Sequence, residues 1–147
     1  MRISATEEYG LRCVLAVARA GGNATIREVA EAEGIGVEYV AKLLQILRRK
    51  GVLESSRGAH GGYMLTRAPA AITLWDVLDG LDAPLWSDTF CAEHAGQRES
   101  CTHGASCSLK VVWRWAGIAV ENALRRVTVA DVLAADRPAL ELRLEAP

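Results

Sequence analysis

Residues 25–66 read TIREVAEAEGIGVEYVAKLLQILRRKGVLESSRGAHGGYMLT and contain the signals of two helices followed by a hairpin. Thr25 stands three residues before Glu28, which is the spacing of a capping box and predicts a helix over 26–33. The segment 34–36, Gly-Ile-Gly, predicts a tight turn, because glycine tolerates the left-handed backbone found at helix ends. The chain is therefore expected to turn sharply and start a new helix.

The next helix is predicted over 37–50, with one apolar face. Its apolar residues recur at helical spacing: Val40, Leu43, Leu44 and Leu47. Two short β-prone runs follow, Val52–Ser55 and Tyr63–Thr66, and the glycine-rich segment 57–62 joins them. Helix, tight turn, helix and hairpin in this order are typical of a winged helix-turn-helix.

The segments around this unit are mostly helical. Helices are predicted over 5–20, 72–81, 107–126 and 129–135, while residues 82–106 have no helical or strand period and are expected to form a loop. The fold class is thus mainly α with a small β-hairpin wing: a winged helix-turn-helix plus a long helix over 107–126.

Three parts are expected along the chain. Residues 1–81 form the winged helix-turn-helix, residues 82–106 the cysteine-containing loop, and residues 107–147 the long helix with a C-terminal tail.

The composition sets limits on function. Half of the residues are hydrophobic, which is enough for a packed core. No apolar run approaches the roughly 18 to 20 residues of a membrane span, and the N-terminus lacks the apolar stretch of a signal peptide, so we expect a cytoplasmic protein without a membrane partner. No Ser/His/Asp set, phosphate-cradling loop or paired carboxylates are evident, so neither an enzyme nor a small-molecule substrate is expected.

Charge is distributed unevenly behind a net value of −1. Residues 1–70 hold ten Lys or Arg against seven Asp or Glu, whereas residues 71–147 hold seven against eleven. Within 37–67 the count is six basic against two acidic side chains. This asymmetry is a hint of nucleic-acid contact, and a solvated basic face is its ordinary alternative.

The polar face of the helix over 37–50 is the candidate surface for reading bases in the major groove. Its N-terminal half is expected to present four side chains to solvent: Glu38, Tyr39, Lys42 and Gln45. Lys42 and Gln45 have base-reading chemistry, and Tyr39 is assigned to a phosphate or a thymine methyl group. Arg48 and Arg49 lie later on the helix and are expected to hold the DNA backbone.

Further DNA contacts are expected at two other places. Arg27 stands near the start of the helix over 26–33, where backbone amides bind phosphate. In the hairpin tip Arg57 and His60 supply donors, and glycines allow close approach to the minor groove. The remaining candidates of this wing are Gly61, Gly62 and Tyr63. A protein-interaction module built from the same elements is the alternative.

Three of the four cysteines, Cys91, Cys101 and Cys107, fall within 17 residues. In a cytosolic protein such a cluster indicates metal binding or redox activity, and thiolates suit iron–sulfur clusters, zinc or copper(I). Zinc with His94 or His103 as a fourth ligand stays open, as does a disulfide switch without a metal.

The fourth cysteine, Cys13, is isolated in a helical pattern and is expected to be a small buried residue.

Several segments resemble one known family. They are the opening Met1–Ser4, Glu8–Arg12, Ile26–Ala30 and the wing Arg57–Leu65 with its Gly-Gly-Tyr. These stretches are similar to the IscR/NsrR/RirA family of bacterial winged-helix regulators, and the resemblance runs from Met1 to about Leu133.

The resemblance implies a homodimeric, sequence-specific transcription regulator of double-stranded DNA. Residues 1–81 are then the DNA-binding domain, and residues 107–126 are the long dimerisation helix at the dimer interface. A two-fold dimer predicts a palindromic operator. The resemblance also implies an iron–sulfur cluster on Cys91, Cys101 and Cys107 that senses redox, iron or nitric oxide status.

The fourth cluster ligand differs among the members that this chain resembles. Some have a His three residues after the last cysteine, where this chain has Lys110. Others resemble an arrangement in which an acidic residue near the start of the partner's first helix completes the site, and Glu8 stands at that position. Three cysteines without that His favour [4Fe–4S] over [2Fe–2S]. The alternative for Glu8 is a first-turn carboxylate stabilised by the helix dipole.

Overall fold

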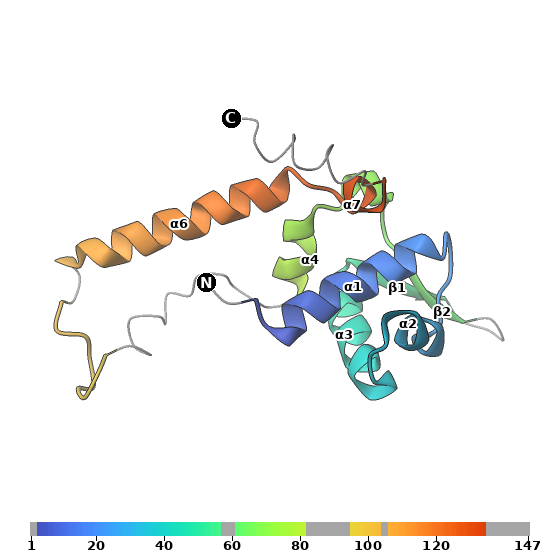
Figure 1. Cartoon of the computed structure of the whole chain (residues 1–147), viewed down its shortest axis with the longest axis horizontal. Helices are drawn as coiled ribbons and strands as arrows, with labels where there is room; N and C mark the ends of the chain where they lie inside the picture. Colours follow the sequence, from blue (N-terminus) through green and yellow to red (C-terminus); the bar gives the residue numbers. More distant parts are fainter. Residues whose placement is uncertain (1–2, 57–60, 82–94, 104–105, 135–147) are drawn as a thin grey trace.

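The computed structural model of the chain describes residues 3–56, 61–81, 95–103 and 106–134. Its elements are, in order, α1 Ala5–Arg19, α2 Ile26–Glu33, α3 Val37–Arg49, β1 Leu53–Ser56, β2 Gly62–Leu65, the 3₁₀ turn η1 Pro69–Ala71, α4 Leu74–Gly80, α6 Ser108–Arg125 and α7 Val129–Ala134 (Figure 1). The predicted mainly helical fold with one small hairpin is confirmed. Within the described residues no helix has the length and apolar content that crossing a membrane requires.

The predicted capping box at the start of α2 is present. The amide of Glu28 donates to Thr25 Oγ1 at 3.2 Å, and the amide of Thr25 donates to Glu28 Oε2 at 2.7 Å. The bonds from Thr25 hold the pKa of Glu28 below its usual value, because they stabilise the charged carboxylate. α2 ends at Gly34 with φ +65°, as the glycine in the predicted turn requires.

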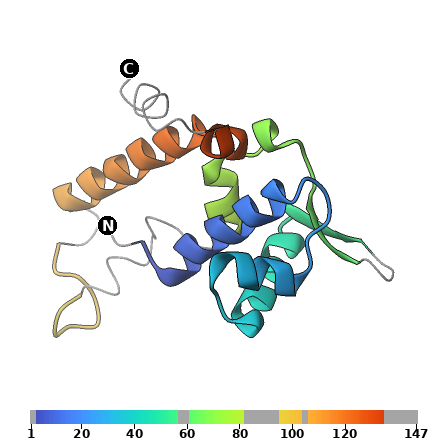
Figure 2. The same cartoon turned by 45° about the vertical axis from the view of Figure 1, so that its right-hand side comes forward.

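The hydrophobic core lies where α1, α3 and α4 meet. All four apolar residues predicted for one face of α3 are fully buried: Val40, Leu43, Leu44 and Leu47. α1 contributes Cys13, Val14 and Val17, and α4 contributes Val77 and Leu78. In Figure 2 these helices form one body from which the hairpin projects on one side.

The hairpin pairs β1 with β2 in antiparallel register, from Leu53 opposite Leu65 to Ser56 opposite Gly62. Both strands are displaced by one residue from the predicted runs. The reason is Val52, which was predicted to begin the first strand but instead closes α3.

The end of α3 has the two hydrogen bonds of a Schellman motif. The amide of Val52 donates to Leu47 O at 3.0 Å, and the amide of Gly51 donates to Arg48 O at 3.1 Å. Gly51 supplies the left-handed backbone with φ +78°. Val52 and Leu47 are both buried, so the cap carries its apolar contact and places the hairpin at a fixed angle to α3.

Backbone pairing ties the base of the hairpin to the loop before α2. The amide of Tyr63 donates to Ala24 O at 2.8 Å, and the amide of Ala24 donates to Tyr63 O at 2.9 Å. Ser56 Oγ donates to Asn23 Oδ1 at 2.9 Å. The hairpin is therefore anchored on two sides, by α3 and by this loop.

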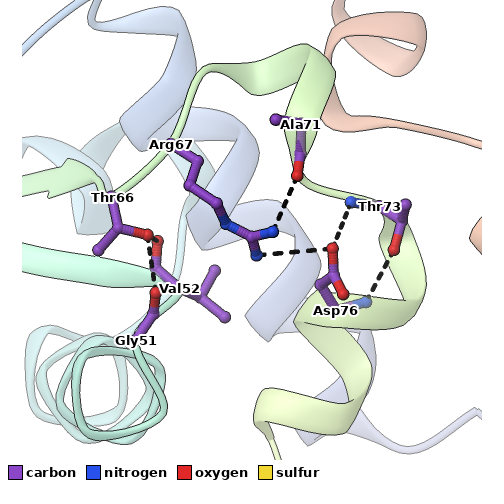
Figure 3. A network of polar contacts seen from close by, with 7 residues as sticks. All are labelled: Gly51, Val52, Thr66, Arg67, Ala71, Thr73 and Asp76. Atoms are coloured by element: carbon purple, nitrogen blue, oxygen red, sulfur yellow. Dashed lines mark hydrogen bonds and ion pairs between the residues drawn. The ribbon is translucent and has the colours of Figure 1, made fainter.

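A polar network fixes the connection from β2 to α4 (Figure 3). Arg67 donates to Ala71 O at 3.0 Å and pairs with Asp76 at 3.6 Å. Thr66 Oγ1 donates to Gly51 O at 2.7 Å, which joins the end of β2 to the end of α3.

The long helix α6 extends away from this body and contacts it through its C-terminal end, near α4 and α7 (Figures 1 and 2). Two backbone bonds hold the segment after it: Leu74 N to Val127 O at 2.9 Å and Val129 N to Ile72 O at 2.8 Å. None of its residues is buried, and its exposed large apolar side chains are Leu109, Val111, Val112, Trp113, Trp115 and Ile118.

We predict that Gly62→Ala destabilises the fold while Gly22→Ala does not. A Cβ at Gly62 would lie 2.6 Å from Ala24 O and 2.8 Å from Asn23 Oδ1, whereas a Cβ at Gly22 meets nothing within 4 Å. Relieving the first overlap requires the hairpin to move away from its anchor, at a cost of about 1–3 kcal/mol in the free energy of unfolding. Urea unfolding followed by circular dichroism measures both variants, and equal stability of the two would contradict the anchoring role of this contact.

Candidate nucleic-acid interface and cysteine loop

A groove of about 640 Å³ lies between the start of α2, the start of α3 and the hairpin. Its lining residues come from segments that are far apart in the sequence: Thr25, Ile26, Arg27, Val37, Glu38, Ala41, Ser55, Ser56, Gly61, Gly62 and Tyr63. Five of the predicted DNA-contacting residues meet here: Arg27, Glu38, Gly61, Gly62 and Tyr63. The three elements that a winged helix-turn-helix uses on DNA thus border one concave surface.

The exposed face of α3 continues from this groove along the helix. Glu38, Lys42, Gln45 and Arg49 follow one another at spacings of four, three and four residues, which places them in one row. All four are exposed, and so is Arg48 beside them. The row runs from an acidic start to a basic end, opposite the four buried apolar residues.

The orientation predicted for Tyr39 is wrong. Its ring is half-buried and packs against the core, its hydroxyl lies 3.0 Å from Thr6 Oγ1, and its ring meets that of Tyr9 edge-on with centroids 6.0 Å apart. The side chain joins α3 to α1 instead of facing solvent. The position of Tyr39 on the helix lies between the buried apolar face and the exposed polar face. The packing of α1 against α3 therefore determines the orientation of its side chain.

Two wing candidates, Arg57 and His60, lie outside the described residues. At the base of the wing, Tyr63 is half-buried and its backbone amide and carbonyl are both bonded to Ala24. Gly62 is in contact with the same loop and leaves no space for a side chain. The wing therefore starts from a rigid base.

Six groove residues were missed by sequence reasoning: Thr25, Ile26, Val37, Ala41, Ser55 and Ser56. Two of them, Val37 and Ala41, lie on α3. Both are apolar and stand four residues apart, a pattern that reads as part of a buried helix face. In the structure Val37 is 49% exposed. The available signal was that neither residue belongs to the row of Val40, Leu43, Leu44 and Leu47.

Two of the three loop cysteines are described, Cys101 and Cys107. Both are half-buried and neither is in a disulfide. Cys107 is the N-cap residue of α6, and its side chain makes no capping hydrogen bond. Free thiols suit a soft metal, and the helix N-terminus at Cys107 suits an anionic cluster, so these donors fit the predicted site.

The complete ligand set cannot be assembled from the described residues, because Cys91 and His94 lie outside them. Within the described part of the chain no three His, Cys, Asp or Glu side chains are grouped as metal ligands. His103 is exposed. The structure thus places Cys107 at the start of α6 and describes Cys101 in the segment 95–103 before it.

Glu8 is exposed in the first turn of α1, whereas its neighbour Glu7 is buried and engaged in the capping box with Ser4. One turn later Arg12 donates to Glu33 Oε2 at 2.9 Å and lies over the ring of Tyr9. The hydrogen bond to Glu33 raises the pKa of Arg12, and the nearby charge of Glu8 contributes to the same rise. Glu8 is therefore accessible as a ligand and electrostatically linked to Arg12.

Cys13 differs chemically from the loop cysteines. It is fully buried in the core on α1, as predicted for an isolated cysteine. Burial disfavours the thiolate and raises the pKa of Cys13 to about 11. This thiol is therefore protonated and shielded at neutral pH.

The model of one protein family, Rrf2, matches residues 3–135 and is described as an iron-dependent transcriptional regulator. The protein rrf2 of Nitratidesulfovibrio vulgaris is 31% identical over 138 residues, covering 90% of this chain and 87% of that protein. The structure of T. potens IscR matches with a TM-score of 0.72 at 27% identity, covering 95% of this chain and 90% of the other.

The crystal structure of the oxidized form of Staphylococcus aureus CymR matches with a TM-score of 0.68 at 25% identity, covering 92% of this chain and 98% of the other. The family is described as regulators, in agreement with the prediction that the chain is not an enzyme.

We predict that iodoacetamide at pH 8 alkylates Cys101 and Cys107 in the folded, metal-free, reduced protein and leaves Cys13 unmodified. The thiolate is the reacting species, and a pKa of about 11 leaves on the order of 0.1% of Cys13 as thiolate at this pH. Peptide mass spectrometry locates the label, and alkylation in urea, where Cys13 also reacts, is the control. Labelling of Cys13 in the folded protein at the rate of Cys101 would contradict its assignment to the core.

Proposed function

We infer that this chain, which belongs to the Rrf2 family of transcriptional regulators, is a homodimeric regulator that binds a specific DNA sequence and responds to a cluster held by its cysteine loop. The observation that carries the proposal is the groove that unites the starts of α2 and α3 with the hairpin. The proposed site of action is the cytoplasm.

The proposed DNA complex places α3 in the major groove. There Lys42 and Gln45 donate to base edges, while Arg48 and Arg49 hold phosphates farther along. Arg27 and the free amides at the start of α2 bind a phosphate on the opposite wall of the groove. The wing contacts the adjacent minor groove, with Arg57 and His60 as its proposed donors.

The proposed dimer forms along α6. Val111, Trp115 and Ile118 make one exposed apolar stripe at spacings of four and three residues, and a second exposed group lies beside it: Leu109, Val112 and Trp113. So much exposed apolar surface on one helix is typical of an interface. Two copies of the same helix cover each other symmetrically, and a two-fold dimer predicts a palindromic operator.

The proposed cluster site consists of Cys91, Cys101 and Cys107 with Glu8 of the partner subunit as fourth ligand. An iron–sulfur cluster held there, [4Fe–4S] in preference to [2Fe–2S], supplies chemistry sensitive to redox, iron or nitric oxide status. Support comes from the iron-dependent description of the family and the structural match with an IscR. Zinc on the same thiols and a disulfide switch are the alternatives that the experiment below separates.

Glu8 is well placed to connect the cysteine loop with the DNA-binding surface. Its neighbour Tyr9 contacts Tyr39 on α3, and Arg12 is bonded to Glu33 at the end of α2. A shift of the first turn of α1 therefore acts on both helices of the helix-turn-helix. This proposed coupling uses contacts that the described residues already make.

We predict that the protein enriches a palindromic sequence from a random duplex library and binds it with two chains per duplex. Affinity should fall steeply with salt, because phosphate contacts release counterions. Arg48→Ala should weaken binding to all sequences and reduce the salt slope by about one. Fluorescence anisotropy at several salt concentrations measures both effects.

The control is Arg19→Ala, which removes an exposed arginine at the end of α1, outside the groove and α6, and should leave the salt slope unchanged. A protein that enriches no sequence, or an Arg48→Ala variant with wild-type slope and affinity, would count against the proposed interface.

We predict that anaerobically purified protein contains iron and sulfide and absorbs visible light. Glu8→Ala should speed loss of the cluster in air without dissociating the dimer, because the thiolates remain while the weaker oxygen ligand is lost. Visible absorption, metal analysis and size-exclusion chromatography give the three readouts. Glu31→Ala, which removes an exposed carboxylate of α2, is the matched control.

A colourless protein with stoichiometric zinc would refute the iron–sulfur proposal. Identical rates of cluster loss in Glu8→Ala and the wild type would remove Glu8 from the ligand set.

A further inference from the structure

Val37 is an exposed apolar residue at the start of the recognition helix. The exposed large apolar residues of the described chain are Ile3, Val37 and the six on α6, so Val37 is the only one within the described part of residues 4–81. It is 49% exposed, and it lies outside the buried face of α3. A β-branched residue also has lower helix propensity than most, so neither the core nor the helix explains its presence.

Ala41 extends Val37 into a short apolar row. The two residues are four positions apart on α3 and therefore lie one above the other on the same side of the helix. Both line the groove, together with Glu38. The carboxylate of Glu38 repels phosphate, so this part of α3 is suited to base edges and the DNA backbone is held elsewhere.

We infer that Val37 and Ala41 recognise thymine through its C5 methyl group, an inference that rests on the proposed DNA binding. In the major groove the methyl group is the apolar feature that distinguishes thymine from the other bases, and small apolar side chains are its usual partners. Burying one methyl group against Val37 corresponds to about a fourfold gain in affinity. Each half of the operator therefore contains a thymine that is read by contact without a hydrogen bond.

The test uses duplexes enriched from a random library by the wild-type protein, with each thymine replaced singly by deoxyuridine. This replacement removes the methyl group and keeps every hydrogen-bonding group of the base. We expect one thymine per half-site, or two adjacent ones, at which deoxyuridine weakens wild-type binding about fourfold. In Val37→Ala the same replacement should change affinity by less than about 1.5-fold, since the contact is already lost.

Arg48→Ala is the matched control, because it should weaken binding to both duplexes and keep their ratio at the wild-type value. The exposure of Val37 means that Val37→Ala should retain the wild-type melting temperature, which is measured alongside. Equal wild-type binding to thymine and deoxyuridine duplexes at every position overturns the inference and leaves sequence-specific DNA binding intact. A full deoxyuridine effect in Val37→Ala also overturns it, whereas failure to enrich any sequence overturns the proposed function itself.

Discussion

The burial of one face of α3 is the constraint on which the arrangement of the molecule depends. Val40, Leu43, Leu44 and Leu47 have no exposed surface, so the helix can rotate only at the cost of exposing several large apolar side chains. The opposite row is thereby fixed toward solvent. The residues that stabilise the core thus also determine which side chains of α3 are exposed to a binding partner. The exposed surface therefore needs no stabilising contacts of its own.

The position of the hairpin also depends on α3. The Schellman motif at the end of α3 sets the direction in which the chain leaves, and the pairing of Tyr63 with Ala24 fixes the return. The groove between them is formed by backbone hydrogen bonds and a glycine contact, which vary little with side-chain rotamers. Its walls are therefore preorganised, which lowers the ordering cost of binding an extended polymer.

Short sequence patterns predicted the fold well at positions where a particular backbone geometry requires a particular residue type. The Thr25–Glu28 box and the turn at Gly34 are examples, because both depend on neighbours in sequence. The strand limits were less accurate, since the burial of Val52 beside Leu47 recruits it to the helix cap. Tyr39 was misplaced because its environment is set by α1, thirty residues earlier, which no local pattern contains.

In the candidate site, too, local sequence patterns predict some features, and contacts with distant segments determine others. The row from Glu38 to Arg49 follows from helical spacing alone, whereas the spacing of the cysteines left both metal binding and a disulfide switch open. The exposure of Val37 depends on where α2 and the hairpin lie. The exposed apolar surface of α6 is typical of an interface, and one sequence indicates that surface without supplying what covers it.

The attachment of α6 at one end has a mechanical consequence. Its 18 residues span about 27 Å, with Cys107 at the free end and the bonds of Val127 and Val129 at the other. In a helix of this length held beside α4, a rotation of about 10° at the attached end would displace the far end by about 5 Å. Conversely, a displacement of a few ångströms at Cys107 becomes only a small angular change at the attached end, where Arg67 and Asp76 connect α4 to the hairpin. In the proposed sensor, this geometry would convert a large displacement at Cys107 into a small change in the orientation of the hairpin.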